Sequence, residues 1–252
     1  MLAKLVGWML LGVVRLLTGA QARWYGCPPK AEQRIYFANH QSHADLVMIW
    51  AALPEELRSI TRPIAARDYW ANTPFKRWIT TEVFNAVYVE RGNAPPAATA
   101  PPAVPAAPPE RIEPSMEPET PLPAQLPLVA PEPAVETVPP PASEGPDPLA
   151  PLIEALTSGD SIIIFPEGTR GHAGEPQKFK SGLYTLATLF PDVVLVPAWI
   201  DNIQRVMPKG EVVPVPILCS VTFGAPLQVE AGEERRPFLD RARAAVIALR
   251  DV

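Results

Sequence analysis

Short runs of apolar residues alternate along the chain with apolar residues at helical spacing. The runs predict buried strands at 34–38, 59–65, 86–90, 161–165, 193–199 and 217–223. The helical spacing predicts helices at 44–53, from Pro74 onward, and at 149–158, 183–190 and 237–250. Strands that alternate with helices predict an α/β fold with a mostly parallel central sheet flanked by helices.

Three local features refine these elements. Thr73 can cap a helix that has Pro74 at its first position. Ser181 is a candidate cap for the 183–190 helix. Pro63 lacks a backbone donor, so we expect it at a sheet edge or near a strand end.

The first 20 residues are almost wholly apolar. Lys4 and Arg15 interrupt them and project within roughly 20° of each other on a helix. This pattern predicts a helix at a membrane interface, with Trp8 as an amphipathic anchor. Two alternatives stay open: a spanning anchor, which needs about 20 apolar residues, and a secretory signal cleaved near residues 20–22.

A proline-rich segment at 94–148 divides the rest of the chain. It contains 19 of the 34 prolines, separated by small or acidic residues. Such a composition cannot bury enough apolar surface to offset chain ordering, which predicts a disordered insertion. The predicted organisation is therefore a membrane-associating helix at 1–26 and one catalytic domain made of 27–93 and 149–252.

Charge and cysteine usage narrow the possible partners. The net charge is −5 and basic residues form no run, so the composition does not favour nucleic-acid binding. Cys27 and Cys219 are far apart in sequence and have no metal-type spacing, which is typical of thiols in a reducing compartment.

His40 and Asp45 form the first candidate chemical pair. His40 follows the 34–38 strand, and Asp45 falls in the first turn of the next helix. A carboxylate can fix the tautomer of an imidazole that takes a proton from an alcohol. The same residues fit a capping box from Ser42 to Asp45, so a purely structural role for Asp45 is the alternative.

The second candidate feature is a pair of arginines that follow predicted strands. Arg91 follows the 86–90 strand, and Arg170 follows the 161–165 strand after a turn that contains Gly168 and Thr169. Guanidinium groups bind two phosphate oxygens at once, and turn amides and a hydroxyl can assist. Lys178 and Lys180 can add positive potential there, although solvated surface lysines are more common.

Four segments in chain order resemble the motifs of the 1-acyl-glycerol-3-phosphate acyltransferase family. A lone His-x4-Asp is a weak signal, but Phe-Pro-Glu-Gly-Thr-Arg is fairly specific and the two in order are a strong one. The resemblance covers roughly residues 30–93 and 150–225. The segments are Asn39–Asp45, Val87–Arg91, Phe165–Arg170 and Val196–Ala198.

The resemblance implies acyl transfer from acyl-CoA or acyl carrier protein to the free hydroxyl of lysophosphatidate, which gives phosphatidate. It implies no cofactor, and association with the cytoplasmic face of the membrane. It places His40 and Asp45 in catalysis. Its substrate-binding residues here are Arg91, Glu167, Gly168, Thr169 and Arg170.

Two departures accompany the resemblance. The second motif often has a glycine where this chain has Asn85, and the proline-rich insertion is longer than the usual connection. Glu167 is harder to place, because a carboxylate repels a phosphate, so it is also a candidate for positioning Arg170 or the loop.

Other functions use the same features differently. A metal hydrolase would use His40, His43 and Asp45 with His172 or Glu167, but these spacings do not match a metal-binding helix pair, so no metal site is predicted. A membrane-associated interaction protein would use the proline-rich segment as its binding part. A different lysolipid acceptor is the remaining alternative.

Overall fold

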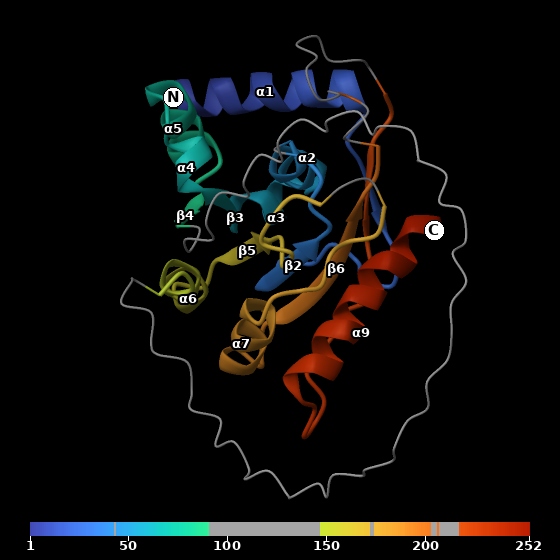
Figure 1. Cartoon of the computed structure of the whole chain (residues 1–252). Coiled ribbons are helices and arrows are strands. Elements are labelled where there is room, and N and C mark those ends of the chain that lie inside the picture. Colours follow the sequence, from blue (N-terminus) through green and yellow to red (C-terminus); the bar gives the residue numbers. More distant parts are fainter. Residues whose placement is uncertain (43, 91–146, 172–173, 203–205, 207–216) are drawn as a thin grey trace, which may run out of the picture. The chain divides into compact units, whose positions relative to one another are not determined.

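The computed structural model describes residues 1–42, 44–90, 147–171, 174–202, 206 and 217–252. Apart from its last two residues, the proline-rich segment predicted at 94–148 lies outside these ranges, as do Arg91, His43 and His172. The described residues on both sides of that segment contribute strands to one sheet (Figure 1).

The sheet has seven strands in the order β1-β7-β6-β2-β5-β3-β4. The five strands from β6 to β4 are mutually parallel, and β7 pairs antiparallel with β6 while β1 runs parallel to β7. This confirms the mostly parallel α/β fold. The strands are β1 (Gln21–Trp24), β2 (Arg34–Ala38), β3 (Thr61–Ala66), β4 (Val87–Val89), β5 (Ser161–Ile164), β6 (Val194–Ile200) and β7 (Ser220–Phe223).

Strand β1 has no counterpart among the predicted elements. Its four residues pair with β7 at the sheet edge, and its sequence lacks a run of apolar residues because the strand is only partly buried. Cleavage of a signal peptide after Ala22 would divide this strand. The edge is therefore defined by long-range pairing that the local sequence does not encode.

Pro63 lies in β3, an interior strand of the sheet. β3 pairs with β5 through residues 61–63 and with β4 through residues 64–66. Pro63 therefore has a strand neighbour on one side only. β3 is not an edge strand, but at Pro63 one side of the strand has no paired neighbour, so the missing backbone donor is tolerated there as at an edge.

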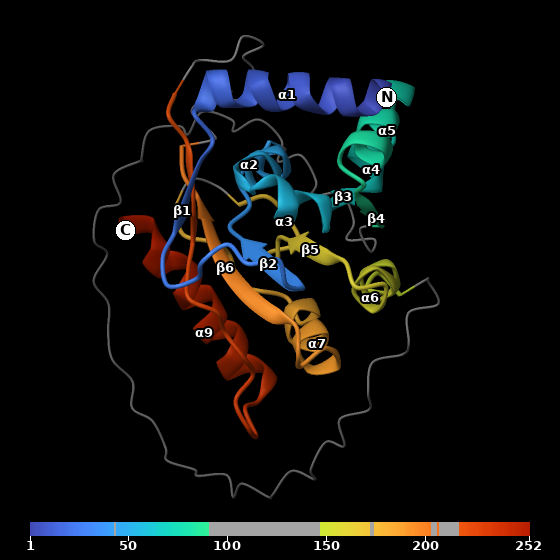
Figure 2. The same cartoon turned by 180° about the vertical axis from the view of Figure 1, so that it is seen from behind.

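Helices cover both faces of the sheet (Figures 1 and 2). One face carries α1, α2, α3 and η1, and the other carries α6, α7 and α9. The helices are α1 (Leu2–Thr18), α2 (Asp45–Ala52), α3 (Glu55–Ser59), α4 (Arg67–Trp70), α5 (Pro74–Trp78), η1 (Ile79–Val83), α6 (Ala150–Thr157), α7 (Gly182–Leu189), α9 (Arg235–Ala248) and η2 (Leu249–Asp251).

The two predicted helix caps have different outcomes. Thr73 caps α5, because its side chain accepts a hydrogen bond from the Lys76 amide at 3.3 Å. Ser181 occupies the cap position of α7 but its side chain makes no capping hydrogen bond, so that part of the prediction was wrong.

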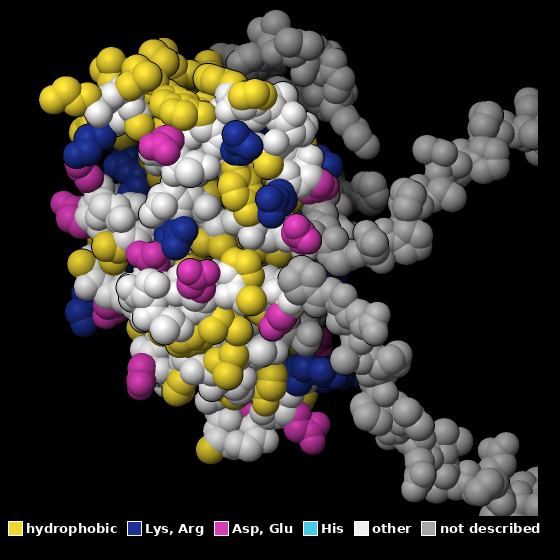
Figure 3. Space-filling model, turned by 90° about the vertical axis from the view of Figure 1, so that its left-hand side faces the viewer, with side chains coloured by type: hydrophobic (Ala, Val, Ile, Leu, Met, Phe, Trp, Pro, Cys, Tyr) yellow, Lys and Arg dark blue, Asp and Glu magenta, His cyan; other side chains and the backbone are white. Residues whose placement is uncertain are grey.

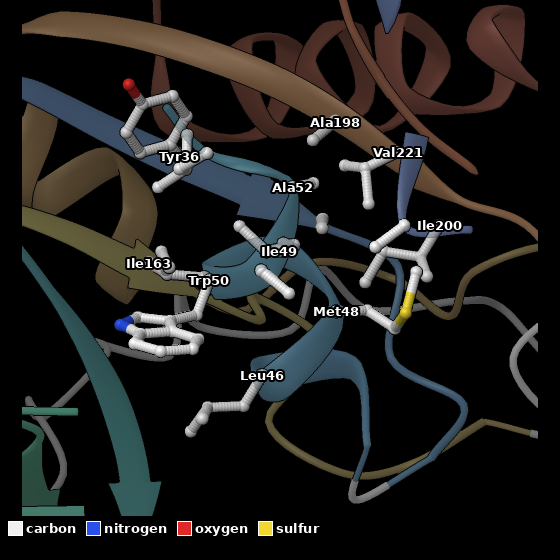
Figure 4. Close-up of a cluster of buried hydrophobic side chains, with 14 of the residues drawn as sticks. Tyr36, Leu46, Met48, Ile49, Trp50, Ala52, Ile163, Ala198, Ile200 and Val221 are labelled. Carbon is white, nitrogen blue, oxygen red and sulfur yellow. The ribbon is translucent and has the colours of Figure 1, made fainter. Parts of the chain in front are cut away.

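Strand β2 divides its side chains between two cores. Tyr36 and Ala38 pack on the face of α2, and Ile35 and Phe37 pack on the face of α7 and α9. All four are fully buried, which explains the uninterrupted apolar run. Figure 4 shows the α2 side of this packing, where side chains of the helix point toward the sheet.

Helix α1 lies across the outside of the α2 layer and is apolar on two sides. Leu11 packs into the core, while the opposite side is apolar and exposed, formed by Leu2, Leu5, Met9, Val13 and Leu16. Hydrophobic side chains gather at the top of the molecule, where α1 runs (Figure 3). Among the described residues, no helix meets the length and apolarity needed to span a membrane.

The two cations of α1 lie near the side of the helix that carries the buried Leu11, because Lys4 and Arg15 project within about 40° of it. The Arg15 guanidinium turns toward α2 and donates to the Ala51 carbonyl oxygen at 3.4 Å. Neither cation therefore lies on the opposite, exposed apolar side.

Candidate active site

The two candidate motifs meet at the carboxyl edge of the parallel strands. β2 ends immediately before Asn39-His40, and β5 ends immediately before Phe165. Because β2 and β5 are parallel neighbours, the segments that leave them lie side by side. This edge is where open α/β sheets place their ligand sites.

His40 and Asp45 form the predicted pair. His40 Nδ1 lies 2.9 Å from Asp45 Oδ2, and the His40 side chain is 16% exposed while Asp45 is buried. The same Oδ2 accepts hydrogen bonds from the amides of Gln41, at 2.6 Å, and Ser42, at 2.8 Å. An oxygen that accepts two amide donors acts as an acceptor toward the ring as well, so these contacts assign a proton to Nδ1 and leave Nε2 as the nitrogen that exchanges a proton with a substrate.

Asp45 therefore combines the two roles that were considered for it, orienting the imidazole and binding the backbone amides before the helix. One carboxylate oxygen ties down the amides of the turn before α2 and also orients the imidazole. The turn fixes Asp45, and Asp45 fixes His40. The five-residue spacing accommodates both functions because the chain folds back over the first turn of the helix.

The loop after β5 also holds the main chain of His40. Glu167 Oε1 accepts from the His40 amide at 2.7 Å, and the Gly171 amide donates to the His40 carbonyl at 2.8 Å. The Phe165 ring stacks on the imidazole, with 4.4 Å between ring centroids and 19° between planes. His40 is thus fixed at its backbone, at Nδ1 and on one ring face.

Glu167 is a buried carboxylate with both oxygens engaged. Oε2 accepts from the Gln177 amide at 2.8 Å, while Oε1 binds His40. Burial raises the pKa of the Glu167 carboxyl above its ordinary value, and the hydrogen bonds from Gln177 and His40 partly oppose this rise. Of the roles considered for Glu167, the one for which the structure provides contacts is positioning of the loops.

Gly171, which contacts His40, and Gln177, which contacts Glu167, were not singled out from the sequence. A Cβ at Gly171 would lie 3.1 Å from Glu167 Oε2, so the close approach of the two loops needs a small residue there. The sequence does show a glycine directly after the Gly-Thr-Arg turn, but only its contact with Glu167 in the folded protein explains why a small residue stands there.

Residues 168–170 form the exposed part of the same loop. Gly168 has φ +69°, a conformation that favours glycine, and its amide donates to the Phe165 carbonyl at 3.0 Å. Thr169 and Arg170 are exposed and precede Gly171, which contacts His40. Arg170, the cation predicted to bind phosphate, is 130 positions from His40 in sequence but directly precedes the glycine whose amide contacts the His40 backbone.

The remaining predicted motifs are only partly described. Arg91 lies outside the described residues, directly after Glu90. Arg67, which the sequence did not single out, follows β3 at the same edge, and its guanidinium lies 3.5 Å from the Glu90 carboxylate. Asn85 has φ +49°, which shows that the position where the resembling family often has glycine adopts a left-handed conformation that asparagine tolerates.

Within the described part of the chain, no three His, Cys, Asp or Glu side chains are placed to hold a metal ion. His43 and His172, which the metal-hydrolase alternative includes, lie outside the described ranges.

Comparison with known proteins defines the class. The family model named Acyltransferase matches residues 27–104 and 141–201, which is more than half of the chain. The chain belongs to this acyltransferase family.

Two individual proteins are similar to parts or all of the chain. The chloroplastic 1-acyl-sn-glycerol-3-phosphate acyltransferase LPAT1 of Arabidopsis thaliana is 38% identical over 64 residues, which are 25% of this chain and 18% of that protein. The crystal structure of the 1-acyl-sn-glycerophosphate (LPA) acyltransferase PlsC from Thermotoga maritima matches 99% of this chain and 80% of its own, with a TM-score of 0.58 and 18% identity. At that identity the second match shows the fold.

Proposed function

We propose that this chain transfers a fatty acyl group from an acyl thioester to the free hydroxyl of lysophosphatidate, which gives phosphatidate. The observation that carries the proposal is the His40–Asp45 pair, held by the same loop that presents Thr169 and Arg170 to solvent. The names of the two similar acyltransferases support this choice of acceptor.

In the proposed mechanism His40 is the general base. Nε2 takes the proton of the acceptor hydroxyl while the hydroxyl oxygen attacks the thioester carbonyl carbon. The new C–O bond forms, the C–S bond breaks, and the imidazolium returns its proton to the departing thiolate. Asp45 stabilises the imidazolium through Nδ1–H, which is the bond present at 2.9 Å.

The acceptor is held through its phosphate. Arg170 supplies a guanidinium that can bind two phosphate oxygens at once. The exposed turn that begins at Gly168 supplies the Thr169 and Arg170 amides and the Thr169 hydroxyl. Arg91 stays a predicted contributor from the next motif. Glu167 contributes indirectly, because its carboxylate fixes the backbone of His40.

The lipid acceptor is reached from a membrane surface in this proposal. The exposed apolar side of α1 would bury its side chains at the lipid interface, with Trp8 at its border. The donor would be acyl-CoA or acyl carrier protein, and the membrane face would be the cytoplasmic one, where these thioesters are available.

The test compares wild-type protein with His40→Ala and His43→Ala in detergent. Lysophosphatidate is supplied with acyl-CoA and, separately, with acyl carrier protein. We expect phosphatidate from the wild type, a loss of about 10²- to 10⁴-fold in His40→Ala, and retained activity in His43→Ala. Thermal unfolding of each variant confirms that the fold is intact.

The outcomes separate the alternatives. If His40→Ala is as active as the wild type, His40 is not the general base. Loss in both histidine variants together with bound metal supports the metal alternative. A wild type that is inactive with lysophosphatidate but active with another lysolipid changes the acceptor and leaves the mechanism in place.

A further inference from the structure

Lys180 lies across the turn that we assign to phosphate binding. A Cβ built on Gly168 would lie 2.7 Å from Lys180 Nζ, 2.8 Å from Cε and 2.9 Å from Cδ. The end of the lysine side chain therefore occupies the space that any other residue at position 168 would need. The ammonium lies against a left-handed glycine whose next two residues are Thr169 and Arg170.

Two backbone anchors place this lysine. The Lys180 amide donates to the Pro166 carbonyl at 2.8 Å, which ties it to the start of the same turn. The preceding residue, Phe179, is buried, and its ring meets Phe37 edge to face at 6.3 Å. Lys180 is thus exposed but held at its base, whereas Lys178 makes no hydrogen bond to the described residues of the turn.

The charge of Lys180 is not neutralised within the described part of the chain. None of the acidic side chains described there forms an ion pair with it. The amides of Thr169 and Arg170 likewise donate to no described acceptor. A cation beside free amides, without an anion, is suited to a polyanionic ligand.

We propose that Lys180 is a substrate-binding residue that, with Arg170 and the 168–170 turn, ligates the phosphate monoester of the acceptor. This inference rests on the proposed function, because it concerns the same site. A monoester carries up to two negative charges and three terminal oxygens, which can engage both cations at once. Gly168 is then favoured for its positive φ, and a Cβ at this position would displace the end of the Lys180 side chain from the turn.

Phosphate also occurs in acyl-CoA, so the experiment separates the two sources. KM and kcat are measured for Lys180→Met and for the matched control Lys178→Met, varying lysophosphatidate at saturating acyl-CoA and then the reverse. Methionine keeps much of the length and removes the charge. We expect the KM for lysophosphatidate to rise about tenfold in Lys180→Met, the size of one solvent-screened charge-assisted hydrogen bond, with kcat nearly unchanged. Lys180→Arg should recover part of the loss.

A second measurement does not depend on turnover. Lysophosphatidate binding is titrated in the His40→Ala background with and without Lys180→Met, and the affinity should fall by the same factor. Unchanged KM and affinity, or an equal effect of Lys178→Met, would overturn the proposal. A rise in KM for acyl-CoA alone would assign Lys180 to the donor and also overturn it. A wild type that makes no phosphatidate refutes the proposed function, and the binding titration then decides Lys180 by itself.

Discussion

The substitution Glu167→Gln tests whether this residue positions His40. The side chain keeps its shape, but one carboxylate oxygen becomes an NH₂ group that faces a backbone amide, either that of His40 or that of Gln177. One hydrogen bond to a charged acceptor is lost and a buried donor is left unpaired, which costs about 1–3 kcal/mol. Relief from burying a charge offsets part of this cost, so we expect a net loss of about 1–2 kcal/mol.

That loss has two measurable consequences. The midpoint of thermal unfolding should fall by about 2–6 °C for a domain of this size. The kcat for acyl transfer should fall by about tenfold or more, because a small displacement of the base is costly, while KM for the acceptor stays nearly unchanged. A direct phosphate-binding role predicts the reverse pattern, with KM changed and stability preserved.

The pH dependence of stability gives an independent check. Burial raises the pKa of the Glu167 carboxyl above its ordinary value of 4.5. A raised folded pKa contributes stability that is fully present below the unfolded pKa and is lost as pH rises through the folded pKa. The unfolding free-energy difference between wild type and Glu167→Gln should therefore be larger at pH 4 than at pH 7. A variant with wild-type stability and wild-type kcat would refute the positioning role.

Two further predictions concern a buried thiol and the outer side of α1. Burial raises the pKa of Cys219 to about 11 from 9.0, so stability present below pH 9 should decline by about 2–3 kcal/mol as pH rises toward 11. Urea titrations at pH 8 and 10.5 measure the unfolding free energy, and Cys219→Ala should lack this decline. An equal decline in wild type and Cys219→Ala would contradict the assignment. Replacing both Leu5 and Leu16 by Ser should weaken binding to phospholipid vesicles by about 3–5 kcal/mol, which is more than 100-fold. The control Leu189→Ser, at an exposed position on α7, should bind vesicles like the wild type. If the Leu5 and Leu16 double variant binds vesicles as well as the wild type, this side of α1 is excluded as the lipid contact.

Local sequence was sufficient for most elements other than β1 and for one half of the site. The apolar run of β5 is buried on both faces as predicted, since a central parallel strand needs no polar side. The contact between His40 and Asp45 was predictable because only four residues separate them and a helix start brings them together. Thr73 and Pro74 marked the beginning of α5 for the same local reason.

The other half of the site depends on strand order. Glu167 acquires its contact with His40 only because β5 inserts beside β2, which pairs residues more than 120 positions apart. The edge strand β1 is similarly defined by its pairing with β7, near the other end of the chain.

The sequence by itself determined the strands β2 to β7, most of the helices between them, and which residue types can carry the chemistry, because periodicity and short spacings are local properties. Only the tertiary structure decided that the Glu167 carboxylate binds the His40 and Gln177 amides, and that the end of the Lys180 side chain lies against Gly168. The physical reason is that burial and hydrogen-bond satisfaction depend on which distant segments become neighbours.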